Sequence, residues 1–530
     1  MSATATPPRS GRAVSARVSE PIARLSPRPV VALAVVTVAL LVVSALLRTT
    51  ALDAGFWIDE ALAVGVASHD LLDIPGVLEL DGSPPLYYAL LHVWMQLFGT
   101  GETATHVLSL VFALATIPAA VWAAGSLWGP RAGWIAGVLA AINPFLTFYA
   151  QETRMYSLMA LLGIVTTAAF LHGFAGRDRR YLPVFAGALV ITLYTHNWGI
   201  FVGGGSVVAL GALWRWSDSG DDRRALLKDA ALTYGAVALL YLPWVPTLLG
   251  QAMHTGAPWA ERPDLDALRS SVGMLLGGAT PALGLLLVGG SGLASLVDRE
   301  SDRDRRTAAL IILTVSGILL AWLASQISPA FASRYLAAFV GPLLVLAACG
   351  LAAAGRLGLI CFALVAFMWF DPRTSQLETK SNVRSVSQSI EQMVTGGDLV
   401  VSTQPESLPL VAYYLPDVVR YADSLGPVED PRVFDWRDAV ERLKAARPTP
   451  TIDRLVRTLE PGQELVLVQP IVRTARWGAP WTGLVRRRAA QWERRLDRDE
   501  RLRREAVVPV FGFDPLPRGV RTVVYRRLDR

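Results

Sequence analysis

Two adjacent carboxylates, Asp59 and Glu60, stand in the segment WIDEALAVG directly after the first long apolar run of the chain. Ionised acids are costly near lipid, so an acidic pair at a membrane surface indicates proton chemistry on a polar substrate. The pair therefore raises the hypothesis that the chain is a membrane enzyme whose active site lies where its first helix leaves the bilayer.

Two arginines open later apolar runs, Arg154 in QETRMY and Arg334 in SRY. A base that deprotonates an acceptor hydroxyl, with fixed positive charge for a departing phosphate, suits transfer from a lipid-linked phosphosugar. The alternative is structural, because arginines at span ends often extend to lipid headgroups. In the same way, His196 at a span end is more often an interfacial hydrogen-bonding residue, and Tyr87 is first of all an interfacial aromatic residue.

The composition indicates a polytopic helical membrane protein. Over 530 residues the chain is 52% hydrophobic and 18% charged, with a mean hydropathy of +0.38. A helix needs about 20 apolar residues to cross a bilayer core of about 30 Å. About eleven runs approach this length: 30–48, 104–127, 131–149, 155–174, 181–196, 198–214, 229–249, 273–297, 307–325, 335–352 and 357–370.

The basic residues predict the orientation. With eleven spans, six basic segments fall on one side, which the positive-inside rule makes cytoplasmic; they are the N-terminal tail, Arg131, Arg177–Arg180, Arg215–Lys228, Arg299–Arg306 and Arg356. This count requires that Pro84–Phe98, which begins with two prolines and carries aromatic residues, is an amphipathic helix on the outer surface. The acidic pair and both arginines then face outward, opposite the basic loops.

These assignments divide the chain into three parts. Residues 1–28 form a basic cytoplasmic tail, and the apolar run that follows is longer than a typical signal-peptide core, which favours an uncleaved first span over a signal peptide. Residues 29–370 form the transmembrane catalytic domain, with a first outer loop at 49–103. Residues 371–530 form an extracytoplasmic α/β domain in a multi-pass protein of the plasma membrane.

Short apolar segments after residue 370 alternate with helical patterns, which is typical of a small α/β domain. The predicted strands are 398–402, 464–469 and 521–525, and the predicted helices are 383–394, 438–446 and 484–505. Arginines between 486 and 504 are interspersed with acids, which favours a solvated face over a lipid- or glycan-binding one. Nucleic-acid binding is not expected for an outward-facing domain.

No cofactor is predicted. The acids of the first outer loop could hold a divalent cation, but they lack a recognisable ligand spacing, so no metal ligand is assigned. No nucleotide-binding glycine motif follows a predicted strand.

Three stretches in order carry a family resemblance: the run WIDEALAVGVASHDLLDIPGVLELDGSPPLYYALLHVWMQLFG, then QETRMYSLMALLG, then SRYLAAFVGPLLVL. Together they resemble GT-C glycosyltransferases of the protein O-mannosyltransferase and aminoarabinose-transferase type, a family 39-like group, over about residues 30–350. The resemblance implies an inverting transfer of a sugar from a polyprenyl-phosphate donor on the extracytoplasmic side.

By this resemblance, Asp59 is expected to be the general base and Glu60 to shape the acceptor or donor pocket. Arg154 and Arg334, with Tyr335 beside them, are expected to contact the donor phosphate or sugar. Relatives often carry His or Lys where this chain has Ser83, which weakens a phosphate contact there. The remaining candidate donor-binding residues are Ser83, Tyr87, Glu152 and His196.

The sequence thus predicts a membrane glycosyltransferase, a mannosyltransferase or a transferase of an arabinose-type pentose, with Asp59 as base. Its partners would be the bilayer, the polyprenyl-phosphate sugar, and a cell-envelope glycan, lipoglycan or protein as acceptor. One alternative is a transporter or flippase for lipid-linked sugars, which mid-span charges and broken helices would favour. A second is a scaffold whose C-terminal region recruits envelope partners.

Overall fold

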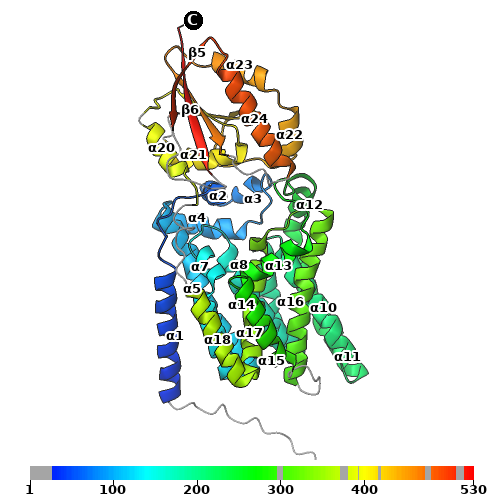
Figure 1. Cartoon of the computed structure of the whole chain (residues 1–530). Coiled ribbons are helices and arrows are strands. Elements are labelled where there is room, and N and C mark those ends of the chain that lie inside the picture. Colours follow the sequence, from blue (N-terminus) through cyan, green and yellow to red (C-terminus); the bar gives the residue numbers. More distant parts are fainter. Residues whose placement is uncertain are drawn as a thin grey trace, which may run out of the picture.

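A computed structural model of the chain describes residues 27–294, 302–370, 380–391, 393–415, 419–471, 479–508 and 519–529. Figure 1 shows three layers: a bundle of long helices, a thin middle layer of short helices, and a C-terminal domain with a sheet. Most of the predicted tail 1–28 lies outside the described residues.

Apolar helices build the bundle. Among the described residues, five segments are long and apolar enough to cross a membrane, Glu102–Trp128, Tyr156–Ala175, Gly220–His254, Asp304–Ile327 and Ser333–Ala353; a sixth is the pair Leu265–Leu275 and Ala279–Ala294, bent by 89°. Shorter apolar helices are Val35–Leu47, Leu86–Phe98, Pro130–Ile142, Tyr181–Thr195, Gly199–Arg215 and Gly355–Trp369. Every predicted apolar run overlaps one of these helices, while the number that cross a membrane stays a prediction.

The described helices of the bundle come from several stretches of the chain, and the middle layer is inserted between α1 and α5. They are α1 (Pro27–Leu47), α5 (Glu102–Trp128), α6 (Pro130–Ile142), α7 (Pro144–Tyr149), α8 (Tyr156–Phe170), η1 (Leu171–Ala175), α9 (Tyr181–Thr195), α10 (Gly199–Arg215), α11 (Gly220–Tyr241), η2 (Leu242–Trp244), α12 (Val245–His254), α13 (Leu265–Leu275), α14 (Ala279–Gly284), η3 (Leu285–Gly289), α15 (Gly290–Ala294), α16 (Asp302–Ile327), η4 (Ser333–Phe339), α17 (Val340–Ala353) and α18 (Gly355–Trp369).

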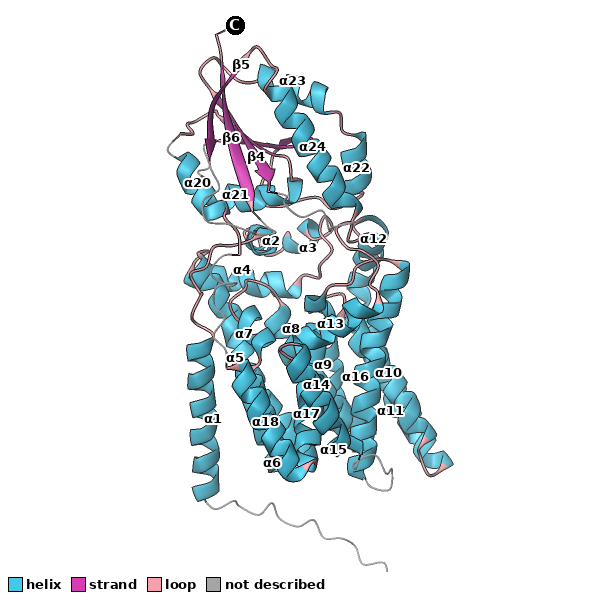
Figure 2. Cartoon of the chain, in the orientation of Figure 1, coloured by secondary structure: helices cyan, strands magenta, loops and turns pink. Residues whose placement is uncertain are grey.

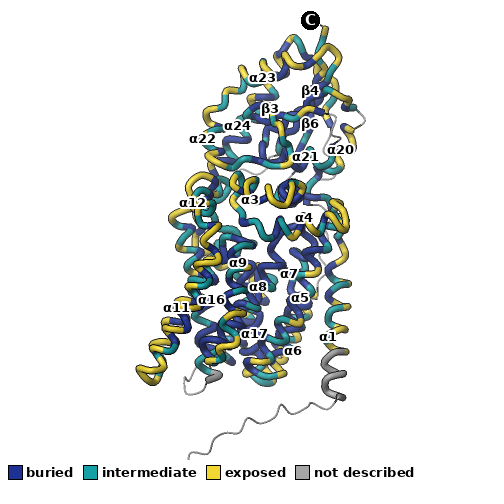
Figure 3. The backbone as a smooth tube through the Cα atoms, turned by 180° about the vertical axis from the view of Figure 1, so that it is seen from behind, coloured by how far each residue is buried: buried dark blue, intermediate teal, exposed yellow. Residues whose placement is uncertain are grey.

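The helices of the bundle pack closely through small residues. A Cβ on Gly163 of α8 would lie 1.9 Å from the carbonyl oxygen of Ala338, so only glycine allows this approach. Burial is concentrated at the centre of the bundle (Figure 3), whereas outward side chains such as Leu239 and Phe367 are apolar and exposed. An apolar surface of this kind suits contact with lipid rather than water.

The middle layer consists of α2 (Ile58–Ala67), α3 (Ile74–Val77) and α4 (Leu86–Phe98), between the bundle and the C-terminal domain (Figure 1). Helix α4 buries Tyr87, Tyr88, Leu91 and Met95 and leaves Leu97 and Phe98 exposed. It is therefore a helix at the predicted position, and its placement at a membrane surface stays a prediction.

The C-terminal domain holds a sheet, magenta in Figure 2. Within the described residues this sheet has six strands in the order β3-β2-β1-β4-β6-β5. Strand β1 pairs in parallel with β2 and β4, with Leu399 opposite Arg420 and Leu465, and the other pairings are antiparallel. The strands are β1 (Leu399–Ser402), β2 (Arg420–Asp423), β3 (Gly426–Val428), β4 (Glu464–Pro470), β5 (Leu502–Val508) and β6 (Val520–Arg527). The helices are α20 (Val383–Glu391), η5 (Pro405–Ser407), α21 (Leu408–Tyr414), α22 (Ala439–Ala445), α23 (Pro448–Arg457) and α24 (Pro480–Leu496).

The three predicted strands are confirmed as β1, β4 and β6, and the first two predicted helices correspond to α20 and α22. The predicted helix 484–505 is wrong beyond Leu496, because Leu502–Val508 is strand β5. This strand lies at the sheet edge with Arg503, Arg504 and Glu505 exposed, so it lacks the apolar alternation that marks a strand.

The C-terminal domain is packed directly on the middle layer. The backbone N–H of Trp436 donates to the carbonyl of Leu80 at 2.8 Å, and a Cβ on Gly65 of α2 would lie 1.9 Å from the carbonyl oxygen of Arg432. Leu62 and Trp259 pack against a cluster that includes Phe434 and Trp481. The two domains therefore share a close interface in which α2 is the central element.

We expect Gly65→Ala to separate this interface, because its methyl group has no room against the Arg432 backbone. Overpacking of this kind costs about 1–3 kcal/mol, which should lower the apparent melting temperature of the detergent-solubilised protein by several degrees. Gly235→Ala in α11 is the matched control, since nothing lies within 4 Å of its Cβ position. Equal melting temperatures for Gly65→Ala and wild type would contradict the packing.

Candidate active site

The acidic pair occupies the first turn of α2, where negative charge is stabilised by the helix dipole. The N–H of Trp57 donates to Glu60 Oε2 at 3.3 Å, which closes the start of the helix. The two neighbouring side chains diverge: the Glu60 side chain is fully buried, while that of Asp59 is 20% exposed. The two carboxylates therefore differ in their access to solvent and to a substrate.

Glu60 is held by contacts from three separate parts of the chain. Its Oε1 lies 2.7 Å from His106 Nε2, accepts from the Thr153 N–H at 2.8 Å and accepts from Lys380 Nζ at 2.8 Å. Burial raises the pKa of this carboxyl group, but the Lys380 ammonium and His106 outweigh burial and lower the pKa of Glu60 to about 2. Glu60 is therefore an ionised carboxylate inside the protein.

Asp59 faces the other way, toward the predicted phosphate-binding arginines. Its Oδ2 lies 3.4 Å from Arg334 Nη2, and its backbone carbonyl accepts from Arg154 Nη1 at 3.2 Å. With a partly exposed carboxylate, two guanidinium groups nearby and a rigid helix start, the position has the elements of a base beside an anion-binding site.

Aromatic side chains surround the Arg334 guanidinium. Its central carbon lies 5.6 Å from the ring centroid of Trp57 and 5.3 Å from those of Trp259 and Tyr335, while Nε donates to the Tyr156 hydroxyl at 3.1 Å. Cation–π contacts hold the guanidinium without neutralising it. The rings and the Tyr156 hydroxyl therefore fix the Arg334 guanidinium, whose acidic partner is Asp59.

Arg154 is 8% exposed and lies beneath the pair, donating to the Tyr88 hydroxyl at 3.4 Å as well as to Asp59. Asp81 lies close by and accepts from Tyr88 at 3.5 Å. Burial raises the pKa of Asp81 against the opposing charge of Arg154. A third acidic group therefore belongs to this cluster.

The other predicted residues divide into two groups. His196 is near the arginines, with its ring 4.9 Å from that of Tyr335 and its Nδ1 accepting from the Trp198 N–H. Glu152 is buried and accepts from Trp57 Nε1 at 2.9 Å, and Tyr87 is buried beside Tyr88. The Ser83 carbonyl accepts from Gln251. The structure thus gathers Asp59, Arg154, Arg334, Tyr335 and His196, while Glu60, Glu152 and Tyr87 lie in the interior.

Sequence analysis did not single out several residues of the cluster: His106, Tyr156, Trp259 and Lys380. Lys380 has one signal that could have drawn attention, because only three of the chain's 50 Lys and Arg residues are lysines. The sequence holds no such signal for His106, Tyr156 or Trp259, because a His within an apolar run or a Trp in an outer loop has many structural uses.

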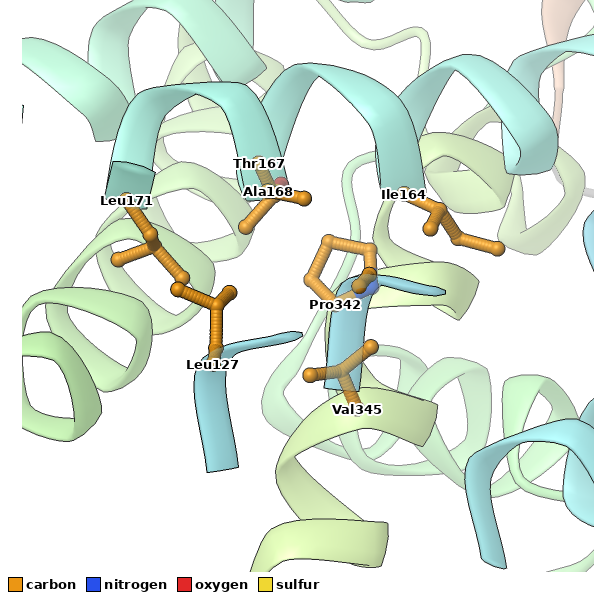
Figure 4. Close-up of a pocket in the computed structure, with 8 residues that line it drawn as sticks. Leu127, Ile164, Thr167, Ala168, Leu171, Pro342 and Val345 are labelled. Carbon is orange, nitrogen blue, oxygen red and sulfur yellow. The ribbon is translucent and has the colours of Figure 1, made fainter. Parts of the chain in front are cut away.

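Within the described parts of the chain, no group of three or more His, Cys, Asp or Glu side chains is placed to hold a metal ion. A separate small pocket lies inside the bundle, between α5, α8 and α17 (Figure 4). It is lined by apolar side chains and Thr167, and it has no ionisable group. Its chemistry is that of a packing gap, so the acidic pair and the arginines remain the candidate site.

No protein-family model and no curated protein matches the chain. Among solved structures, the chain is similar to ArnT from Cupriavidus metallidurans bound to undecaprenyl phosphate, with a TM-score of 0.61 and 15% identity over 94% of this chain and 98% of that one. It is also similar to the oligosaccharyltransferase AglB from Archaeoglobus fulgidus in complex with an inhibitory peptide and a dolichol-phosphate (TM-score 0.55, 11% identity, 83% and 70% covered). A mycobacterial arabinofuranosyltransferase, AftD, matches 96% of this chain and 40% of its own (TM-score 0.51, 15% identity).

The chain is thus a polytopic helical membrane protein with a C-terminal sheet domain. Its fold is the GT-C fold, as in these membrane glycosyltransferases, which confirms the predicted resemblance at the level of the fold.

We expect the stability of the protein to depend on Glu60 with a defined pH window. Its pKa falls on folding from an ordinary 4.5 to about 2, so its stabilisation is complete above about pH 5 and is lost as the pH falls toward 2. Glu60→Gln, which leaves Lys380 buried without its carboxylate, should cost about 3–5 kcal/mol at pH 7. The difference from wild type, followed by thermal unfolding, should narrow by about 2 kcal/mol at pH 3. A difference that stays constant from pH 7 to 3 would contradict an ionised Glu60.

Proposed function

We propose that the chain is a membrane glycosyltransferase that moves a sugar from a polyprenyl-phosphate donor to a hydroxyl of a cell-envelope glycan, lipoglycan or protein. The observation that carries this proposal is the partly exposed Asp59 carboxylate beside the Arg334 guanidinium, on the GT-C fold. Support for the donor class comes from the relatives solved with undecaprenyl phosphate and dolichol phosphate. Mannose and an arabinose-type pentose are both compatible with the site.

In the proposed reaction, Asp59 accepts the proton of the acceptor hydroxyl as its oxygen attacks the anomeric carbon. The bond from that carbon to the phosphate oxygen breaks on the opposite face, so the anomeric configuration inverts. The electron pair leaves with polyprenyl phosphate, whose added negative charge Arg334 and Arg154 stabilise. The proton on Asp59 passes to solvent, and the enzyme needs no nucleotide sugar.

The remaining predicted residues receive roles from their positions. Tyr335 and His196, next to Arg334, are proposed to contact the donor sugar. Glu60 and Glu152 are proposed to act by fixing α2 and Trp57, because both side chains are buried, Glu60 among His106, Thr153 and Lys380 and Glu152 against Trp57 Nε1. Tyr87 and Ser83 are proposed to support the Tyr88–Asp81 side of the cluster. The proposal requires no metal, and the N-terminus is proposed to be cytoplasmic with the site outside.

One observation favours a second candidate, a transporter of lipid-linked sugars. The apolar pair α13 and α14–α15 is bent by 89°, and broken helices of this kind occur in transporters. In this chain Ser271 Oγ of the broken helix lies 2.8 Å from Oγ of Ser333, the residue before Arg334. The broken helix therefore also supports the proposed catalytic site.

Asp59→Asn should abolish sugar transfer while donor binding is retained, because the amide cannot accept the acceptor proton. A general base contributes about 10²–10⁴-fold. The assay supplies membranes with radiolabelled polyprenyl-phosphate sugars and an envelope extract as acceptor. Asp70→Asn, which changes an exposed acid of the same loop, is the control and should transfer at the wild-type rate. Equal transfer by Asp59→Asn and wild type would remove Asp59 as base; movement of label across vesicles without transfer would favour the transporter.

Arg334→Gln should weaken binding of polyprenyl phosphate by about 10–100-fold, because a hydrogen bond to a charged group contributes about 1.5–3 kcal/mol. Equilibrium binding of radiolabelled polyprenyl phosphate to the purified protein measures this. Arg269→Gln, at an arginine whose side chain is 75% exposed on α13, should bind as wild type does. Unchanged binding by Arg334→Gln would show that the phosphate lies elsewhere.

A further inference from the structure

Lys380 reaches from the C-terminal domain into the membrane domain. Its side chain is 1% exposed, and its Nζ contacts Glu60 Oε1 at 2.8 Å, the Gln151 carbonyl at 2.6 Å and His106 Nε2 at 3.2 Å. We propose that Lys380 is a positioning residue for sugar transfer: by binding Glu60 it fixes Asp59 against Arg334 and makes the C-terminal domain part of the active site. This inference rests on the proposed function.

The three contacts of Lys380 join the segments that carry the reacting groups. Glu60 is the residue after Asp59, and Gln151 belongs to the turn that leads into Arg154. The same Glu60 oxygen also accepts from the Thr153 N–H, and Arg154 in turn donates to the Asp59 carbonyl. The buried Lys380 ammonium therefore contacts both the segment that carries the proposed base and the turn that leads into one of the proposed phosphate-binding arginines.

The use of lysine at this position is chemically specific. A lysine ammonium is a compact charge, and here its Nζ donates to two acceptors, Glu60 Oε1 and the Gln151 carbonyl, whereas an arginine presents a broad planar fork. The chain strongly prefers arginine elsewhere and has only two other lysines, Lys228 and Lys444, both exposed. A compact ammonium suits this buried position, where Nζ lies 2.8 Å from Glu60 Oε1 and 2.6 Å from the Gln151 carbonyl oxygen.

Removal of the ammonium should change the charge of Glu60. Titratable groups that interact with Glu60 are Lys380, His106 on α5 and Tyr87 on α4, while its neighbour Asp59 accepts from Arg154 through its backbone carbonyl; Lys380 and His106 hold Glu60 ionised. Without Lys380, burial favours the protonated acid, which cannot hold the start of α2 in the same way. A displacement of about 1 Å at a reacting group can lower the rate by about 10²-fold.

The interface offers a matched control that does not involve Glu60. Arg384, four residues after Lys380, donates to Glu102 and to the carbonyl of Asp53. Arg384→Met therefore removes a contact between the same two domains while it leaves the Glu60 contacts in place. A role in docking alone predicts similar losses for Lys380→Met and Arg384→Met.

The experiment compares sugar transfer by full-length wild type, Lys380→Met, Arg384→Met, Glu60→Gln and the double variant Glu60→Gln/Lys380→Met. We expect Lys380→Met to lower kcat by about 10²-fold with the donor KM within about threefold of wild type, and Arg384→Met to stay within about threefold in both. In Lys380→Met the acid limb of the kcat–pH profile should move to higher pH, because Glu60 now titrates. The double variant leaves no unpaired buried charge. Its kcat should fall by no more than that of Lys380→Met, and the acid limb of its kcat–pH profile should not move.

Two outcomes of this comparison overturn the proposal. Equal losses in Lys380→Met and Arg384→Met would reduce Lys380 to a docking contact. If the fold-loss in kcat of the double variant equals the product of the losses in Lys380→Met and Glu60→Gln, Lys380 and Glu60 act independently. The double variant keeps the test valid if Lys380→Met alone does not fold, since a double variant with wild-type kcat would also contradict the positioning role.

Amine labelling tests the docking without any assay of transfer. In folded wild type, an N-hydroxysuccinimide ester followed by mass spectrometry should modify Lys228 and Lys444 and leave Lys380 unmodified; in Glu60→Gln, Lys380 should become more reactive. If all three lysines react equally in wild type, the buried contact is wrong. If Lys380 is protected but wild type transfers no sugar, the docking stands and the proposed function fails.

Discussion

The burial of one carboxylate constrains the architecture of the site. A charged Glu60 away from water is tolerated only because cations and N–H donors surround it, and these come from α5, from the turn before α8 and from the C-terminal domain. Each partner must therefore be in place for the others to be stable. The start of α2 is fixed as a result. The position of the partly exposed Asp59 side chain is fixed with it.

The two neighbouring acids show how adjacent residues of the same chemistry acquire different roles. Asp59 and Glu60 differ by one methylene group and one position on the helix, yet one side chain is fully buried and the other is 20% exposed. The buried acid is balanced by a lysine and a histidine, while the exposed acid meets an arginine held among aromatic rings. The protein thus places one carboxylate in a buried network and leaves its neighbour accessible to solvent.

Local patterns were enough to predict the helical membrane class, the position of each apolar helix and three of the six strands. The edge strand β5 was missed because its exposed Arg and Glu side chains resemble a polar helix face. Asp59, Arg154 and Arg334 could be chosen because unusual charges next to apolar runs are visible in the sequence. Lys380 and His106 could not, since their partner Glu60 lies 320 and 46 residues away and only the tertiary fold brings them together.

The position of Lys380 in the chain has a consequence for biosynthesis. The ribosome completes all the bundle helices through α18 before it adds Lys380, so a nascent chain already inserted in the bilayer still lacks the cation that balances Glu60. The last third of the protein must be synthesised and folded against α2 before the acidic pair reaches its final geometry. A partly made chain therefore has its bundle helices but lacks the contacts that fix the acidic pair.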